Sequence, residues 1–188
     1  MRRLFNNVIS VIHSAIRFGL LKIFNWNGLS VKLIERFSPN IVFEINRGAK
    51  VRLGKMVRAH SGCKFKVRKN AELIIEDGVK INYNCIFVCR EKIVVGAGTE
   101  FGPSVYIYDH DHDFRAEGGV KAGKFKTAPV KIGNNVWIGA NTMILRGTTI
   151  GNNCVIGAGS VVSGRIPDNS VLVQKREATI LPIDSAKG

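Results

Sequence analysis

Branched aliphatic residues recur every six positions in the C-terminal half of the chain. The register consists of Ile132, Ile138, Ile144, Ile150, Ile156 and Val162. Glycine follows four of these six residues, and small or β-branched residues stand four positions after them. A helix buries residues with a period near 3.6, and a half-buried strand with a period of 2. A period of six therefore predicts short strands joined by turns, with each aliphatic side chain directed into a shared core.

Shorter stretches of the same register lie upstream. One consists of Val67, Leu73, Val79 and Cys85, and another of Val95, Phe101 and Ile107. The phase of the repeat shifts at about residues 86–94 and again at 108–131. These two breaks predict irregular corners or loops, and a loop as long as 108–131 inside a compact repeat is usually functional.

The six-residue pattern resembles the hexapeptide-repeat family of left-handed parallel β-helices, in which three hexapeptides form one triangular coil. The resemblance implies an all-β fold with an N-terminal amphipathic helix, six to seven coils and one long loop that interrupts them. Residues 18 positions apart are then expected to stack at the ~4.8 Å spacing of neighbouring strands. The expected pairs are Ile132 with Ile150, Ile138 with Ile156, and Ile144 with Val162.

The N-terminal segment has a different pattern. Apolar residues between positions 4 and 24 follow helical spacing, with arginine and lysine between them. Fifteen of the 28 Lys and Arg residues, but only two of the 14 Asp and Glu residues, lie in residues 1–70. The helix is expected either to pack on the domain or a neighbouring subunit, or to lie on an anionic membrane surface. We therefore divide the chain into a basic helical segment (1–40), a β-helix domain (41–174) and a tail (175–188).

Composition excludes several classes of protein. The chain has 188 residues, 45% of them hydrophobic and 22% charged, which is typical of one globular domain. It has no uninterrupted run of ~18 apolar residues, so a polytopic membrane protein is not expected. The basic region lacks the motifs of nucleic-acid-binding modules, so no nucleic acid is expected as a partner. The four cysteines, Cys63, Cys85, Cys89 and Cys154, are expected to be buried and reduced in a cytoplasmic protein.

The long loop carries the candidate chemistry in its opening sequence, Asp-His-Asp-His-Asp at residues 109–113. If the preceding strand continues, His110 and His112 project to one side and the aspartates to the other. Two imidazoles suit either a metal site with a third ligand or general-base catalysis near neutral pH. The third interpretation of the same residues is a solvated polar turn.

Residues 79–167 resemble the acetyl-CoA-dependent O-acetyltransferases of the hexapeptide family. The match lies in the long loop with its two histidines (108–131), the Asn-Asn-Val-Trp at 134–137 and the Gly-Ala-Gly-Ser at 157–160. The resemblance is closest to enzymes that acetylate sugars of bacterial surface polysaccharides. It implies acetyl-CoA as co-substrate, a sugar or glycan precursor as acceptor, a homotrimer and no metal. It also implies a cytoplasmic location, either free or at the inner face of the membrane.

The resemblance also implies roles for individual residues. The general base falls on His110, and His112 is expected to orient it, contact the acceptor or share its role. The backbone N–H of Ala140 is the expected oxyanion donor. The asparagine that binds the acceptor sugar is expected to be Asn82 or Asn84. The expected donor-binding residues are Trp137, Gly139, Ala140, Ala158, Ser163, Lys175 and Arg176.

Two other functions remain open at the level of the sequence. One is a zinc-dependent hydratase of the carbonic-anhydrase type, which shares the fold and would use His60, His110 and His112 as ligands. The other is a non-catalytic β-helix scaffold. The sequence departs from the acetyltransferase pattern at Ser163-Gly164-Arg165, which shifts a basic residue by one position, and in the tail after Val173.

Overall fold

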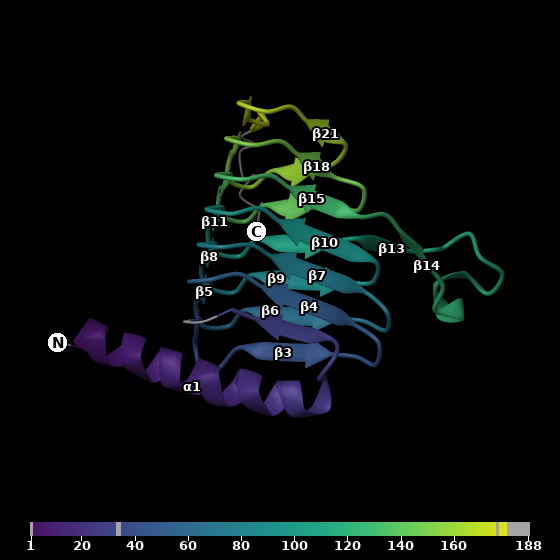
Figure 1. The fold of residues 1–188 in the computed structure, drawn as a ribbon. Helices are drawn as coiled ribbons and strands as arrows, with labels where there is room; N and C mark the ends of the chain where they lie inside the picture. Colours follow the sequence, from purple (N-terminus) through teal and green to yellow (C-terminus); the bar gives the residue numbers. More distant parts are fainter. Residues whose placement is uncertain (1, 33–34, 176, 180–188) are drawn as a thin grey trace, which may run out of the picture.

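The computed structural model describes residues 2–32, 35–175 and 177–179. A long helix, α1 (Arg2–Phe24), lies across one end of a left-handed parallel β-helix (Figure 1). The β-helix has three parallel sheets, and each coil of the chain adds one strand to sheets A, B and C in turn. Sheets A and B have seven strands each and sheet C has six, so the described residues form six complete coils and part of a seventh.

Each sheet runs the length of the β-helix, with its strands stacked in coil order. Sheet A contains β1 (Leu29–Val31), β4 (Lys50–Leu53), β7 (Glu72–Ile75), β10 (Lys92–Val95), β15 (Val130–Ile132), β18 (Thr149–Ile150) and β21 (Arg165–Ile166). Sheet B contains β2 (Arg36–Phe37), β5 (Arg58–Ala59), β8 (Lys80–Ile81), β11 (Glu100–Phe101), β16 (Trp137–Ile138), β19 (Val155–Ile156) and β22 (Val171–Leu172). Sheet C contains β3 (Val42–Ile45), β6 (Lys64–Val67), β9 (Ile86–Cys89), β12 (Tyr106–Tyr108), β17 (Met143–Ile144) and β20 (Val161–Val162).

The six-residue register predicts the stacking of the C-terminal coils correctly. The register pairs are Ile132 with Ile150, Ile138 with Ile156, and Ile144 with Val162, as expected. All six side chains are buried. The four cysteines are also buried and unpaired.

Helix α1 closes the open end of the first coil. Phe18 is buried and its ring meets the edges of Phe37 and Phe43, with centroids 5.1 and 5.6 Å apart. The buried Ser14 hydroxyl accepts a 2.8 Å hydrogen bond from the backbone N–H of Phe37. The predicted helix is therefore confirmed, and it covers apolar side chains that a terminal coil of a repeat protein otherwise exposes.

The β-helix begins earlier than the predicted boundary at residue 41. Strands β1 and β2 complete the first coil, and Leu29 and Phe37 are buried in the shared core. The early coils are wider than three hexapeptides, because Val51 pairs with Leu73, 22 residues later, whereas Ile132 pairs with Ile150 after 18. The strict period therefore does not extend to the first coil.

The outer face of α1 is apolar and exposed. Exposed side chains on this helix include Val8, Ile12, Ile16, Leu20, Ile23 and Phe24. By length and composition alone, the stretch Asn7–Phe24 is sufficient to cross a membrane. It was not evident as an apolar run because Ser10, Ser14 and Arg17 interrupt it. Two of these residues are used by the fold, since Ser14 bonds Phe37 and Arg17 donates to backbone carbonyls at Ser38 and Pro39.

Candidate active site

The chain leaves the stack of coils after Tyr108. The carboxylate of the next residue, Asp109, hydrogen-bonds to the corner of the neighbouring coil. Strand β12 lies on β9, so Asp109 stands above the corner that contains Arg90 and Glu91. The fully buried carboxylate accepts hydrogen bonds from the N–H of Arg90 at 2.8 and 3.0 Å and from the N–H of Glu91 at 2.7 Å. These bonds satisfy backbone donors that the departing chain leaves without a ladder partner. They also fix the orientation of the carboxylate.

His110 is held by this carboxylate. Its Nδ1 lies 3.2 Å from Asp109 Oδ1, and its side chain is only 12% exposed. Because an ionised carboxylate only accepts hydrogen bonds, Nδ1 carries the proton and Nε2 presents a lone pair. Burial lowers the pKa of His110, and the hydrogen bond and negative charge of Asp109 oppose this shift. The imidazole is therefore neutral near pH 7 and can accept a proton at Nε2.

An antiparallel hairpin encloses His110. Strand β13 (His110–His112) pairs with β14 (Phe125–Thr127) and projects from the side of the β-helix (Figure 1). The Phe125 ring contacts both histidines, at centroid distances of 5.5 Å from His110 and 4.5 Å from His112. The Arg90 guanidinium covers Phe125 at 3.3 Å from its centroid. An ion pair between Asp111 and Arg146 ties the hairpin to the next coils.

The turn that follows β16 presents backbone donors instead of side chains. Among the described residues, none accepts a hydrogen bond from the backbone N–H of Ala140 or Ala158. The turn with Ala158, which follows β19, stacks closely on the turn with Ala140. A Cβ placed on Gly139 would lie 2.5 Å from the Ala158 nitrogen. Trp137 precedes this corner on sheet B and is 59% exposed. The corner is therefore a narrow surface with unpaired N–H groups, suited to binding carbonyl oxygens.

A family model named bacterial transferase hexapeptide (six repeats) matches residues 129–164, which form β15 to β20. These residues are therefore similar to the repeat unit of bacterial hexapeptide transferases. A hexapeptide-repeat acetyltransferase from Vibrio cholerae has the same architecture, with a TM-score of 0.53 and 26% identity. The alignment covers 84% of the present chain and 73% of the Vibrio chain.

Two curated relatives from Escherichia coli are named as acetyltransferases of sugars or lipopolysaccharide. The putative lipopolysaccharide biosynthesis O-acetyl transferase WbbJ is 29% identical over 136 residues, which are 68% of this chain and 69% of WbbJ. Galactoside O-acetyltransferase is 40% identical over 90 residues, which are 48% of this chain and 44% of that enzyme. The chain spans about half the length of several curated relatives that it matches.

The residues that the hexapeptide resemblance assigns to one site lie at two edges of the β-helix. His110 follows sheet C, at the corner that leads to sheet A, whereas Ala140 and Ala158 follow sheet B. Figure 1 shows the β13–β14 hairpin on the side opposite the sheet B strands β5, β8 and β11. A single chain therefore does not bring the proposed base to the proposed donor corner.

The remaining donor-side predictions are spread along the last coils. Ser163 is exposed at the corner after β20, which is the same edge as the hairpin. Lys175 is exposed beyond β22, next to Gln174, whose side-chain amide bonds both backbone groups of Val161 at 2.7 and 2.9 Å. Arg176 lies outside the described residues.

Asn82 and Asn84 both occupy the corner after β8. The Asn82 side chain accepts a 2.9 Å hydrogen bond from the N–H of Tyr83. Asn84 has a φ of +59° and hydrogen-bonds through its N–H to Ser61 O at 3.0 Å. These contacts show what each asparagine does in the turn, and both side chains remain at an accessible corner of the coil.

The three histidines of the zinc alternative do not form a site in this chain. His60 follows β5 and stacks on Tyr83, with ring centroids 4.7 Å apart, whereas His110 and His112 lie on the hairpin. Across residues 2–32, 35–175 and 177–179, no three His, Cys, Asp or Glu side chains are grouped to hold a metal ion.

Sequence reasoning missed the role of Asp109. Alternation along a continuing strand placed Asp109 on the side opposite His110, but β12 ends at Tyr108 and β13 belongs to a different sheet. The change of direction at Asp109 brings the two side chains together. His110 and His112 do share a face, as predicted, because both contact Phe125. The signal available in the sequence was the position of Asp109 at the phase break of the repeat.

Proposed function

We propose that the protein is an acetyl-CoA-dependent O-acetyltransferase that modifies a sugar hydroxyl of a surface-glycan precursor. The single observation that carries this proposal is the Asp109–His110 pair, in which a buried carboxylate holds Nδ1 and leaves Nε2 available. Support comes from the hexapeptide family model and from relatives named as O-acetyltransferases. In a scaffold, the Asp109 carboxylate would serve only to accept the N–H groups of Arg90 and Glu91, and the histidine held against it on the hairpin would have no role.

The reaction follows from the free Nε2 atom of His110. Nε2 accepts the proton of the sugar hydroxyl while the sugar oxygen attacks the thioester carbonyl of acetyl-CoA. The tetrahedral intermediate collapses, the carbon–sulfur bond breaks, and the proton on His110 passes to the leaving thiolate. No covalent acyl-enzyme is required, because holding both substrates together supplies much of the rate.

The donor side of the proposed site uses backbone N–H groups. The N–H of Ala140 would stabilise the oxyanion, and the N–H of Ala158 would bind an amide of the pantetheine arm. Trp137 would line the channel for that arm. Because His110 and Ala140 lie at different edges of one chain, we propose a homotrimer in which the hairpin of one protomer faces the Ala140 corner of the next. Ser163 and Lys175 are proposed to contact the donor from the last coils, with Gly139 keeping the corner narrow. Arg176 is proposed as a further donor contact.

The donor half of this proposal predicts that acetyl-CoA binds and that Trp137→Ala weakens the binding about tenfold, since a large aromatic contact is lost. Isothermal calorimetry with acetyl-CoA measures this. The matched control is Trp26→Ala, which removes the second tryptophan, an exposed residue near the end of α1. Absence of acetyl-CoA binding to the wild-type protein, or an equal loss in both variants, would contradict the proposal.

We also propose that the protein works at the cytoplasmic face of a membrane, with the exposed apolar face of α1 in the lipid interface. The concentration of basic residues in the first 70 positions supports this location, because anionic headgroups attract such a segment. Lipid-linked glycan precursors are found at that surface, which brings the proposed acceptor close to the enzyme.

The membrane proposal predicts binding to vesicles that contain phosphatidylglycerol and weaker binding to neutral vesicles. Ile16→Asp places a carboxylate on the exposed apolar face of α1 and should weaken binding about tenfold or more. Vesicle co-sedimentation measures the effect. The control is Val171→Asp, a similarly exposed apolar residue on β22 at the far end of the β-helix. Equal sedimentation of both variants would assign the contact to another surface.

A further inference from the structure

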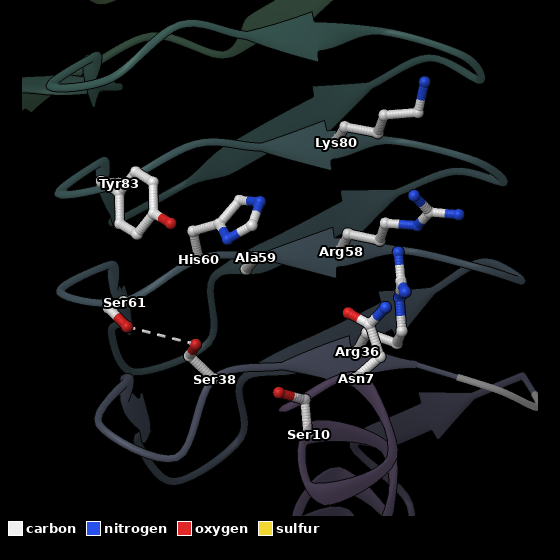
Figure 2. Close-up of a pocket in the computed structure, with 10 residues that line it drawn as sticks. All are labelled: Asn7, Ser10, Arg36, Ser38, Arg58, Ala59, His60, Ser61, Lys80 and Tyr83. Atoms are coloured by element: carbon white, nitrogen blue, oxygen red, sulfur yellow. Dashed lines mark hydrogen bonds between the residues drawn. The ribbon is translucent and has the colours of Figure 1, made fainter. Parts of the chain in front are cut away.

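A cavity of about 1070 Å³ lies between helix α1 and the first three coils, on the sheet B side (Figure 2). It is separate from the His110 hairpin, which leaves the β-helix at the edge between sheets C and A. The lining residues come from α1, from three neighbouring strands of sheet B and from the turns that follow them. They are Asn7, Ser10, Arg36, Ser38, Arg58, Ala59, His60, Ser61, Lys80 and Tyr83.

One side of the cavity is a ladder of cations. The parallel register places Arg36 beside Arg58 and Arg58 beside Lys80, at the ~4.8 Å spacing of neighbouring strands. Figure 2 shows the Arg36 guanidinium directed toward that of Arg58. The next residue in the ladder, Glu100, forms an ion pair with Lys80. No Asp or Glu is among the described residues that line the cavity.

Cationic side chains on neighbouring strands create a positive potential that attracts an anion able to contact both. Arginine suits phosphate in particular, because its planar guanidinium donates two parallel hydrogen bonds to phosphate oxygens. Two adjacent arginines therefore match two adjacent phosphate groups better than a single carboxylate or sulfate.

The opposite side of the cavity presents rings and hydroxyl groups that are suited to a sugar. His60 and Tyr83 form a ring pair with centroids 4.7 Å apart, and the Ser61 hydroxyl donates to Ser38 Oγ at 3.2 Å. Hydroxyl groups both donate and accept hydrogen bonds, as sugar hydroxyls require. The volume is close to the upper end of the range for cavities that hold whole cofactors or ligands, about 300–1,000 Å³. It exceeds the space that one phosphate ion needs.

We propose that this cavity binds a glycosyl diphosphate, with Arg36 and Arg58 on the diphosphate and the His60–Tyr83 wall beside the sugar. Identification of that sugar as the acetyl acceptor rests on the proposed function, whereas binding of the diphosphate does not. Helix α1 supplies Asn7 and Ser10 to the cavity and presents its apolar face outward. The same diphosphate chemistry occurs in nucleotide sugars and in polyprenyl-linked sugars.

Calorimetry with inorganic pyrophosphate tests the anion site without acetyl-CoA or an acceptor. The wild-type protein should bind pyrophosphate, and Arg58→Gln should weaken binding about tenfold to a hundredfold. Arg58→Lys keeps the charge and should retain part of the affinity. The control is Arg52→Gln, which removes one positive charge from sheet A in the same coil. Thermal unfolding of each variant should match that of the wild type.

Competition against pyrophosphate shows whether the cavity prefers a nucleotide sugar or a polyprenyl-linked sugar. UDP-glucose represents nucleotide sugars and farnesyl diphosphate represents the lipid-linked class, and the tighter competitor identifies the ligand. The proposal is overturned if pyrophosphate does not bind, if Arg52→Gln weakens binding as much as Arg58→Gln, or if neither organic diphosphate competes. A protein that binds these diphosphates but never consumes acetyl-CoA would refute the proposed function and leave the anion site intact.

Discussion

Replacing His110 by Ala should reduce kcat/KM for acetyl transfer about 10²–10⁴-fold, the usual contribution of a positioned general base. Acetyl-CoA binding should be nearly unchanged, because the proposed donor contacts come from the backbone N–H groups of Ala140 and Ala158 and from Trp137, and not from the His110 side chain. Release of free CoA in the presence of an acceptor measures the rate, and calorimetry measures the binding.

His112→Ala is the matched control for this experiment. His112 lies two residues further along the same strand and contacts Phe125, but its side chain is exposed and no carboxylate of the described residues bonds to it. Its loss should therefore reduce the rate much less than the loss of His110. A collapse of activity in His112→Ala with near-normal activity in His110→Ala would move the base to the second histidine.

Asp109→Asn should lower kcat about 10²-fold or more, because an amide no longer favours the tautomer with a proton on Nδ1. The acidic limb of the pH profile of kcat/KM supplies a second readout. Asp109 raises the pKa of His110 against the larger effect of burial, so removing its charge should lower that pKa further. Since the active base is the neutral imidazole, the limb should move to lower pH.

The pH profile separates this positioning role from a structural one. Asp109→Asn also disturbs the hydrogen bonds from Arg90 and Glu91, so the thermal midpoint should fall as well. A variant that is only less stable would lose activity without a shift of the acidic limb. Asp111→Asn is the comparison, because the exposed Asp111 carboxylate pairs with Arg146 and raises the pKa of His110 only weakly through its charge, so the acidic limb should move less than in Asp109→Asn.

The repeat could be predicted well where each coil is close to three hexapeptides. The pairing of Ile132 with Ile150 in sheet A follows directly from the spacing of aliphatic residues, whereas Ile150 pairs with Ile166 after 16 residues and leaves the six-residue register. The first coils do not follow the six-residue register, because their strands in sheets A and C are longer and the number of residues between paired strands varies. Phenylalanines fill that wider core, as the stacked rings of Phe43, Phe65 and Phe87 show.

The site could be predicted only in part, because it depends on how the chain leaves the repeat. The sequence identified His110 and His112 as candidate residues, and it correctly placed them together on one face. The orientation of Asp109 was not predictable from alternation, since the strand ends one residue before it. The cation ladder was not predictable either, because Arg36, Arg58 and Lys80 are each 22 residues apart and no six-residue register connects them.

The most direct test of the central claim is acceptor-dependent consumption of acetyl-CoA by the purified wild-type protein. The protein is incubated with acetyl-CoA and, in turn, with simple sugars, nucleotide sugars and lipid-linked glycan extracts, and free CoA is followed over time. The proposed function predicts CoA release that requires one acceptor class and yields an O-acetylated sugar. No release with any of these acceptors, together with no measurable binding of acetyl-CoA, would contradict it.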